Sequence, residues 1–306
     1  MRIEVGHHSD SRFEVFVRLW YATAIKSFSC LSCLSFPPAC LTMTIDLRNP
    51  EPLLAFDDKA SAVQRALAGL DAAHSRYTAE LCRGGILQNS IDALRVELTY
   101  HSNAIEGSTL TLRETQLILE GYSPPGGKPL CEIYEARNHD RALRLIESWA
   151  KDRPADAPLT EADVLAIHAR VLADIDAAAA GRFRSERVLI KGTRFVPPGS
   201  HKFGHLVPAM LGLANRPGVH PCIQAAELHY NFVALHPFSD GNGRTARLLM
   251  NDLVLRRGFP HAIIEIERRS DYLQALEAAS DGRWESFAVF VIDSMERSIQ
   301  KVIGND

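Results

Sequence analysis

A short stretch around residue 240 combines the residue types that nucleotide phosphate chemistry requires. Pro237 disfavours the helical conformation for the residue before it, so His236 should end a helix and have a free imidazole. Asp240 supplies a carboxylate of the kind that binds Mg²⁺. Arg244 and Arg247 are three residues apart, so both lie on one helix face and could bind phosphate oxygens. The spacing predicts nucleotide phosphate transfer to an acceptor, with His236 as the base that deprotonates the incoming hydroxyl.

The loop before these arginines is rich in glycine. Gly241 and Gly243 tolerate positive φ and let backbone N–H groups come close to an anion. The helix that follows directs the positive end of its dipole to the same place. Each feature alone has an ordinary explanation: a tight turn, a helix terminus or a solvated helix face. Their coincidence favours a functional site, because these ordinary explanations do not predict one another.

The segment His236–Arg247 resembles the Fic family signature H-P-F-x-[DE]-G-N-G-R-x-x-R and matches every specified position. The likeness extends over roughly residues 95–300. It includes Ala225–Val233, which is similar to the helix that precedes the signature, and Arg182–Pro198, which is similar to the family's β-hairpin flap. The resemblance implies a protein adenylyltransferase. Such an enzyme transfers AMP from ATP to a Ser, Thr or Tyr hydroxyl of a target protein, which is unknown here.

The resemblance also implies roles for individual residues. His236 would be the catalytic base, and Asp240 would ligate Mg²⁺ on the α- and β-phosphates of ATP. The nucleotide-binding residues would be Asp240, Gly241, Asn242, Gly243, Arg244, Arg247, Tyr272 and Ser280. Tyr272 would contact adenine, whereas Ser280 stands where related proteins often have Asn. Flap residues Val188, Leu189 and Ile190 would align the target by strand-like main-chain pairing.

A second motif, Ser102-Asn-Ala-Ile-Glu106-Gly107, follows the family's inhibitory pattern [ST]-x-x-x-E-[GN]. Ser102 and Glu106 are four residues apart at a helix end with Gly107 as its C-cap, so the motif could also be simply a helix terminus. Beside a complete signature, we expect Glu106 to form an ion pair with Arg247. That pair would occupy the group that the γ-phosphate needs, and the chain would inhibit itself.

Two alternatives use the same residues differently. A hydrolase could remove AMP from a modified protein, with Glu106 positioning the attacking water. A non-catalytic regulatory or nucleic-acid-binding protein could carry a degenerate site, but the intact His236, Asp240 and two arginines argue against that.

Helices must position these residues, because apolar residues recur at helical spacing along most of the chain. A short hairpin is expected over Arg187–Val196, closed by Pro197-Pro198-Gly199. The fold class is therefore all-α, and the resemblance implies the Fic helical bundle with a short β-hairpin flap. We expect helices over Lys59–Cys82, Leu87–Ile105, Leu112–Leu119, Glu132–Ala150, Thr160–Ile175 with Thr160 as N-cap, His205–Leu213, Pro221–Leu235, Asn242–Arg257, Ser270–Ala279 and Arg283–Ile303.

The composition is that of a folded globular protein. The chain has 306 residues, a net charge of −3 and 46% hydrophobic residues, which excludes a disordered chain and disfavours polybasic nucleic-acid or membrane-surface proteins. No apolar run is long enough for a clear membrane span. The six cysteines, three of them in the first forty residues, do not form the framework of a secreted scaffold. We expect a cytoplasmic protein with no nucleic-acid or membrane partner.

The chain is expected to have three parts. Residues 1–42 differ in composition from the remainder, and Met43 begins a more ordinary sequence, so these residues could be an extension from a mis-assigned start. Residues 43–95 are expected to form an N-terminal helical arm. Residues 96–304 would form the Fic domain, with the inhibitory helix at about 96–107. The resemblance also makes a homodimer plausible.

Overall fold

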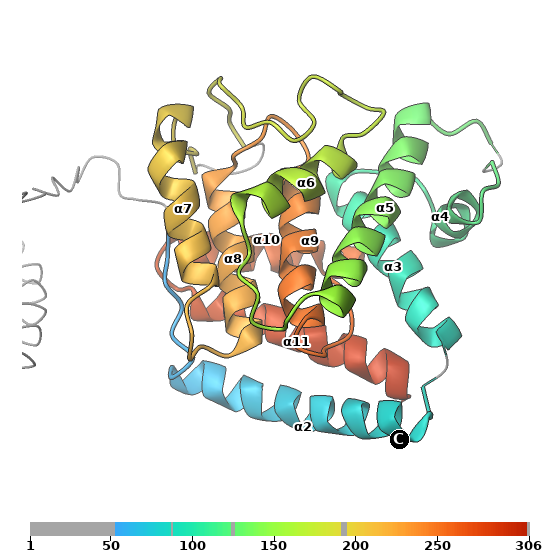
Figure 1. The fold of residues 1–306 in the computed structure, drawn as a ribbon, viewed down its shortest axis with the longest axis vertical. Coiled ribbons are helices and arrows are strands. Elements are labelled where there is room, and N and C mark those ends of the chain that lie inside the picture. Colours follow the sequence, from blue (N-terminus) through green and yellow to red (C-terminus); the bar gives the residue numbers. More distant parts are fainter. Residues whose placement is uncertain (1–52, 87, 124–125, 191–194, 305–306) are drawn as a thin grey trace, which may run out of the picture. The chain divides into compact units, whose positions relative to one another are not determined.

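Two adjacent helices, α8 (Pro221–Leu235) and α9 (Asn242–Leu255), form the centre of the fold (Figure 1). The structure, a computed structural model, describes residues 53–86, 88–123, 126–190 and 195–304. Almost every residue of α8 is buried, polar ones included, and such burial is typical of a helix with neighbours on every side. The expectation for residues 1–42 lies outside the described residues, as does that for residues 43–52 of the predicted arm.

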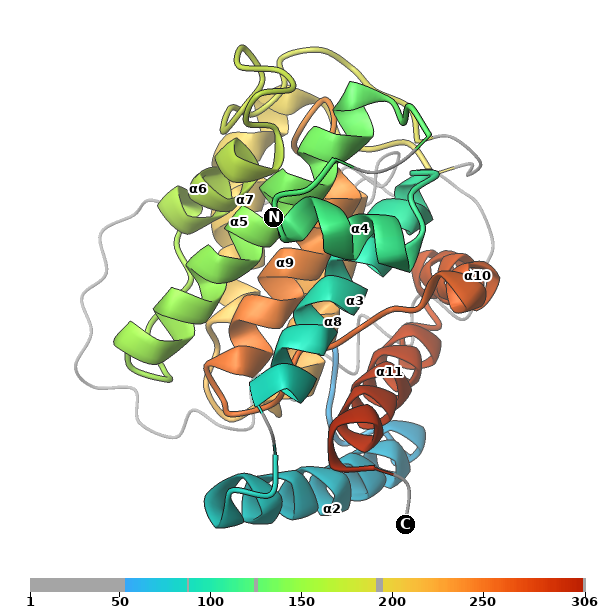
Figure 2. The ribbon, with the colours of Figure 1, turned by 90° about the vertical axis from the view of Figure 1, so that its right-hand side faces the viewer.

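The central pair separates two hydrophobic clusters. One contains residues of α2 (Ser61–Arg83), α10 (Arg269–Ser280) and α11 (Glu285–Ile303). The other contains residues of α3 (Gln88–Glu106), α5 (Leu130–Asp152), α6 (Glu161–Val171) and α7 (Phe203–Ala214). Figure 2 shows α2 and the C-terminal end of α11 away from α4 (Leu112–Leu119), and α2 packs against α11. Because α8 and α9 contribute to both clusters, the loop that joins them is held from both sides.

Local sequence signals explain several helix boundaries. Thr111 and Glu114 form a capping box at the start of α4, and Thr160 and Asp163 form another at the start of α6. Pro221 occupies the first position of α8, where its missing N–H costs no hydrogen bond. These signals place helix starts where the sequence predicts them.

The expected helices are confirmed, with small differences at their ends. The ranges Leu112–Leu119 and Pro221–Leu235 agree at both ends. The helix expected over Thr160–Ile175 corresponds to α6, which ends at Val171, and Asp174 has a φ of 61°, a left-handed conformation that a helix cannot contain. α3 is continuous across residues 95 and 96, where the sequence places the boundary of the arm.

The described residues contain no β-strand, so the all-α class is confirmed and the expected hairpin is not seen in them. Residues 187–190 and 195–199 have irregular backbone, and the expected turn, residues 191–194, lies outside the described residues. Within the described part of the chain, no helix combines the length and the apolar character needed to cross a membrane.

Candidate active site

The loop 236–241 holds the predicted base at the C-terminus of α8. His236 ends the helix in the left-handed conformation, with φ 47° and ψ 58°, and its N–H donates to the Phe232 carbonyl at 2.9 Å. This conformation is rare for a residue with a Cβ, although histidine is among the residues that adopt it most readily. The following Pro237 explains why residue 236 leaves the right-handed helix, as the sequence predicts.

The imidazole of His236 has the tautomer of a base. Its Nδ1 lies 3.3 Å from the Val233 carbonyl, which can only accept, so Nδ1 carries the proton and Nε2 carries the lone pair. Burial lowers the pKa of His236 against the opposing hydrogen bond to the Val233 carbonyl; the charge of Arg184 lowers it further, whereas Glu106 and Asp240 raise it. The ring is therefore neutral at neutral pH.

The rest of the loop is fixed by side chains that lie beneath it. The side-chain amide of Asn242 accepts from the Phe238 N–H at 3.0 Å and donates to the Phe238 carbonyl at 2.8 Å. His168 stacks on the Phe238 ring and contacts the Asp240 carbonyl through Nε2 at 3.0 Å. A Cβ at Gly241, where φ is 74°, would lie 3.1 Å from a methyl group of Val171, so glycine is required there both by conformation and by space. These contacts fix the buried start of α9 beside the exposed Asp240.

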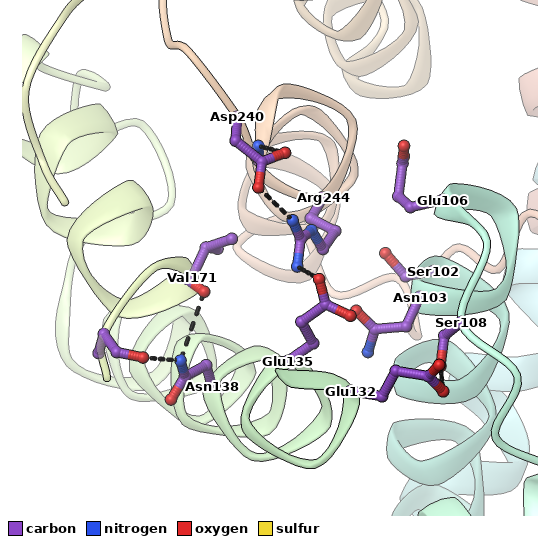
Figure 3. Close-up of polar contacts among 12 residues, drawn as sticks. Ser102, Asn103, Glu106, Ser108, Glu132, Glu135, Asn138, Val171, Asp240 and Arg244 are labelled. Carbon is purple, nitrogen blue, oxygen red and sulfur yellow. Dashed lines mark hydrogen bonds and ion pairs between the residues drawn. The ribbon is translucent and has the colours of Figure 1, made fainter. Parts of the chain in front are cut away.

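Arg244 connects the carboxylates of Glu135 and Asp240 (Figure 3). Its Nη1 donates to Glu135 Oε1 of α5 at 2.9 Å, and its Nη2 donates to Asp240 Oδ2 at 3.3 Å. The Arg244 side chain is 4% exposed, whereas that of Asp240 is 67% exposed. Burial raises the pKa of Glu135, although Arg244 opposes the shift. Asp240 therefore presents its carboxylate to solvent, and Glu135 of α5 holds the buried side chain of Arg244 in place.

Arg247 is bound by the residues of the predicted inhibitory motif. Its Nη2 donates to Glu106 Oε1 at 2.7 Å and to the Ser102 carbonyl at 2.8 Å, and its Nε donates to Ser102 Oγ at 2.9 Å. The side chain of Arg247 is 1% exposed and that of Glu106 is 41% exposed. The expected ion pair between these residues is present, and it lies at the outer end of the guanidinium.

The position of Glu106 depends on a glycine. A Cβ at residue 243 would lie 2.1 Å from Glu106 Oε1, so only glycine leaves space for the carboxylate above the first turn of α9. Burial favours the neutral form of Glu106, but the charge and hydrogen bond of Arg247, with the charge of Arg244, outweigh it and lower the pKa of the carboxyl. Glu106 is therefore an anion in the place where the sequence predicts anionic phosphates.

The residues predicted to contact adenine lie on α10. Tyr272 is 3% exposed, and its hydroxyl lies 3.3 Å from His229 Nε2, so the ring offers little surface to a base. Burial raises the pKa of Tyr272 to about 12. Ser280 is exposed, and its hydroxyl donates to the Glu277 carbonyl at 2.7 Å. Of the predicted flap residues, Leu189 is 81% exposed, and Val188 and Ile190 are partly buried.

Three residues that contact the site were not predicted individually from the sequence. Glu135 and His168 belong to no motif in the sequence, and Arg184 lies in the segment that resembles the flap. Glu135 reaches Arg244 from α5 and His168 reaches the loop from α6, and no local spacing shows which helices will pack against the site. Arg184 did carry a signal, since it lies in the Arg182–Pro198 segment that resembles the family.

Comparisons with known proteins agree with this geometry. The sequence model of the Fic/DOC family matches residues 158–254. The protein named protein adenylyltransferase Fic from Drosophila melanogaster is 34% identical over 264 residues, which cover 84% of this chain and 53% of that protein. The protein of the same name from Culex quinquefasciatus is 37% identical over 207 residues, which cover 67% of this chain and 41% of that protein. The chain thus spans about half the length of the curated relatives it matches.

Solved structures share the fold. Fic-1 from C. elegans superposes with a TM-score of 0.69 at 31% identity, covering 79% of this chain and 72% of that chain. A Fic family protein from Desulfovibrio desulfuricans superposes with a TM-score of 0.69 at 25% identity, covering 82% of this chain and 76% of that chain. From the matched signature, the identity to these relatives and the shared fold, the chain belongs to the Fic/DOC family.

Proposed function

We propose that this chain is a protein adenylyltransferase, which transfers AMP from ATP to a hydroxyl side chain of a target protein. The observation that carries the proposal is the position of the neutral imidazole of His236 beside the start of α9, where Asp240, Arg244 and Arg247 gather. The name of the curated relatives supports the same activity.

In the proposed reaction, His236 Nε2 takes the proton of the target hydroxyl. The hydroxyl oxygen forms a bond to the α-phosphorus of ATP, and the bond between that phosphorus and the oxygen bridging to the β-phosphate breaks. The products are the AMP-modified side chain and pyrophosphate. The proton stays on His236 until solvent removes it, which is easy for a histidine whose pKa is lowered by burial and by Arg184.

Asp240 fits the role of the magnesium ligand. Mg²⁺ at nucleotide sites is held by one or two carboxylates together with phosphates and water, and an exposed single carboxylate is such a donor. The described residues contain no group of three acidic, histidine or cysteine side chains that would form an all-protein metal site. When bound, Mg²⁺ would neutralise charge on the phosphates. The backbone N–H groups of Gly241, Asn242 and Gly243 would hold the phosphates in place.

Glu106 would inhibit this reaction by occupying Arg247. The guanidinium of Arg247 donates to Glu106 and Ser102, so a phosphate must displace Glu106 to bind its outer nitrogen. The lowered pKa of Glu106, which Arg247 causes against the effect of burial, keeps the carboxylate ionised and repels the phosphate. A chain in this state would bind ATP weakly or in an unproductive position.

The target would bind along residues 188–190. The backbone of these residues is in no strand, and Leu189 is 81% exposed, so an extended target segment could pair with them. This pairing would form the flap that the family resemblance implies. Adenine would lie near α10, with Ser280 as its exposed polar neighbour and Tyr272 beneath.

The proposal is tested by incubating the chain with ATP labelled at the α-phosphate and Mg²⁺. Glu106→Gly should strongly increase the label that the chain attaches to itself, and adding His236→Ala should abolish it. Label that is unchanged by Glu106→Gly would refute the inhibitory role, and label that persists in the His236→Ala protein would refute the base. Release of AMP from a pre-modified target, without incorporation, would instead favour the hydrolase.

A further inference from the structure

The side chain of Arg184 contacts the catalytic loop and the segment that would align the target. Its Nε donates to the His236 carbonyl at 2.7 Å. Its Nη1 donates to the Glu186 carbonyl at 2.6 Å, and its Nη2 donates to the Pro198 carbonyl at 2.7 Å. Three nitrogens of one guanidinium therefore bind three carbonyls from separate parts of the chain.

The guanidinium is held rigidly in this position. Arg184 is 5% exposed, and its Cζ lies 4.9 Å from the centre of the Phe203 ring. The backbone N–H of Arg184 also donates to the Pro237 carbonyl at 3.0 Å, so both its main chain and its side chain are bound to the loop. A planar group with fixed donors sets the relative positions of its acceptors more strictly than a flexible ammonium can.

These contacts matter because of the conformation of His236. A left-handed residue other than glycine is maintained only where its surroundings fix it. The His236 carbonyl receives a charge-assisted hydrogen bond from Arg184, which is stronger than one from a neutral donor. The same cation binds Glu186 and Pro198, which flank the expected flap on either side.

We propose that Arg184 is a positioning residue, which fixes the backbone of His236 relative to Glu186 and Pro198 so that the base faces the aligned target hydroxyl. The inference rests on the proposed function of His236 and extends it to a residue outside the signature. Arg184 makes its contacts to residues other than the phosphate-binding stretch Asp240–Arg247. It should therefore affect the transfer step more than nucleotide binding.

The test compares substitutions in the Glu106→Gly background. Arg184→Met removes the charge and all three donors, whereas Arg184→Lys keeps the charge and at most part of the hydrogen bonding. Arg182→Met is the matched control, because Arg182 is an exposed arginine two residues away. The transfer rate at saturating ATP should fall at least tenfold in Arg184→Met, fall less in Arg184→Lys, and stay within twofold in Arg182→Met. The KM for ATP should stay within twofold in all three.

Chemical rescue addresses local misfolding. With Arg184→Ala, added guanidinium ion at millimolar concentration should restore part of the rate, and sodium chloride at the same ionic strength should not. Transfer that is unchanged in Arg184→Met, an equal loss in Arg182→Met, or a KM for ATP that rises in proportion to the loss of rate would each overturn the proposal.

A second readout does not depend on activity. Amide hydrogen exchange of residues 184, 185 and 202, whose N–H groups donate to the Pro237 carbonyl, the Glu186 carboxylate and the Gly199 carbonyl, should be at least tenfold faster in Arg184→Met, with exchange in α8 and α9 unchanged. If the Glu106→Gly parent transfers no AMP, the proposed function fails, and hydrogen exchange still decides whether Arg184 fixes these segments. Exchange that is equal in the two proteins would overturn the positioning role.

Discussion

Arg247 has more than one partner, and this determines how strongly Glu106 can inhibit. Ser102 binds Arg247 through both its hydroxyl and its carbonyl, so the guanidinium stays in place when the carboxylate leaves. Removing Glu106 therefore frees one N–H of Nη2 while the other contacts to Ser102 hold the side chain. Substitutions that weaken the contact between Glu106 and Arg247 to different degrees should therefore raise the rate of AMP transfer to different degrees.

Glu106→Gln is expected to release the inhibition only in part. The amide still accepts a hydrogen bond from Arg247, but it loses the charge, and a charge-assisted hydrogen bond is roughly twice as strong as a neutral one. If the difference is about 1.4 kcal/mol, incorporation of labelled AMP should rise about tenfold, and Glu106→Gly should exceed it. Glu97→Gln on the same helix, whose partner is Lys301, is the control and should change nothing. Equal rates in Glu106→Gln and the unmodified chain would contradict the role of charge.

The pH dependence of transfer should report the ionisation of His236. Burial, with Arg184, lowers the pKa of His236 below its usual 6.5, and only the neutral ring can accept the hydroxyl proton. The rate of the Glu106→Gly protein at saturating ATP should therefore be constant from about pH 7 to 8.5 and fall only below about pH 6.5. Glu106 raises the pKa of His236, so removing it shifts the acid limb further down. An acid limb with a midpoint above 6.5 would contradict this assignment.

At the scale of elements, the contact between Arg244 and Glu135 joins α9 to α5. Both side chains are largely buried, and the hydrogen bond between them is 2.9 Å long. Asp240, which also binds Arg244, belongs to the same loop as the start of α9 and cannot replace the connection to α5. The position of Arg244 for phosphate binding thus depends on a residue far away in the sequence.

Glu135→Gln should lower the free energy of unfolding by about 1–3 kcal/mol, because it leaves a buried cation without its main counter-charge. Urea unfolding followed by circular dichroism measures the change. Asp174→Asn is the control, since it removes an exposed ion pair to Arg141 on the same helix and should cost less than about 1 kcal/mol. Asn also tolerates the left-handed conformation of residue 174. A loss in Glu135→Gln that is no larger than in the control would contradict the importance of this pair.

The sequence predicts elements best where a boundary has a local chemical cause. Both ends of α8 are correct, because Pro221 begins the helix and Pro237 forces the residue before it out of the helix. The end of α6 is predicted four residues too late, because no local rule indicates that Asp174 adopts a left-handed conformation. The hairpin is inferred from β-branched and apolar residues around a turn, but strand formation depends on a pairing partner, and residues 187–190 have none in the described structure.

In the candidate site, too, the sequence predicts features that have a local cause and misses those that depend on how distant helices pack. The ion pair of Glu106 with Arg247 is predicted because two motifs, each recognisable locally, belong to one family. Glu135 and His168 depend on how α5 and α6 pack against the loop, and this packing is set by apolar surfaces that many arrangements could satisfy. Arg184 lies in a segment that resembles the family, but its three carbonyl partners become visible only when the chain is folded.

At the scale of the whole molecule, α2 packs against α11, whereas the polar contacts of the site come from α3, α5, α9 and the loop after α8. The cluster that contains α2 and α11 is completed by α8 and α9 from one side, whereas Arg247, Glu106 and His236 lie where α3 meets these central helices. α2 packs against α11, and its buried residues are Val63, Leu67, Leu70, Ala73 and Tyr77. The outer helices should thus contribute to stability without setting the geometry of the site.

Leu70→Ala tests this separation. The side chain is fully buried between α2 and the rest of the core, so the substitution should lower the free energy of unfolding by about 2–5 kcal/mol. In the Glu106→Gly background, the transfer rate per folded molecule at 20 °C should stay within twofold of the parent, because Leu70 belongs to α2, which packs against α11, whereas the partners of Arg244 and Arg247 lie on α3, α5 and the loop before α9. Leu81→Ala on the same helix is the control, since Leu81 is 46% exposed and should change stability by less than about 0.5 kcal/mol. A fall in the rate that parallels the loss of stability, measured where both proteins are fully folded, would show instead that packing at α2 reaches His236.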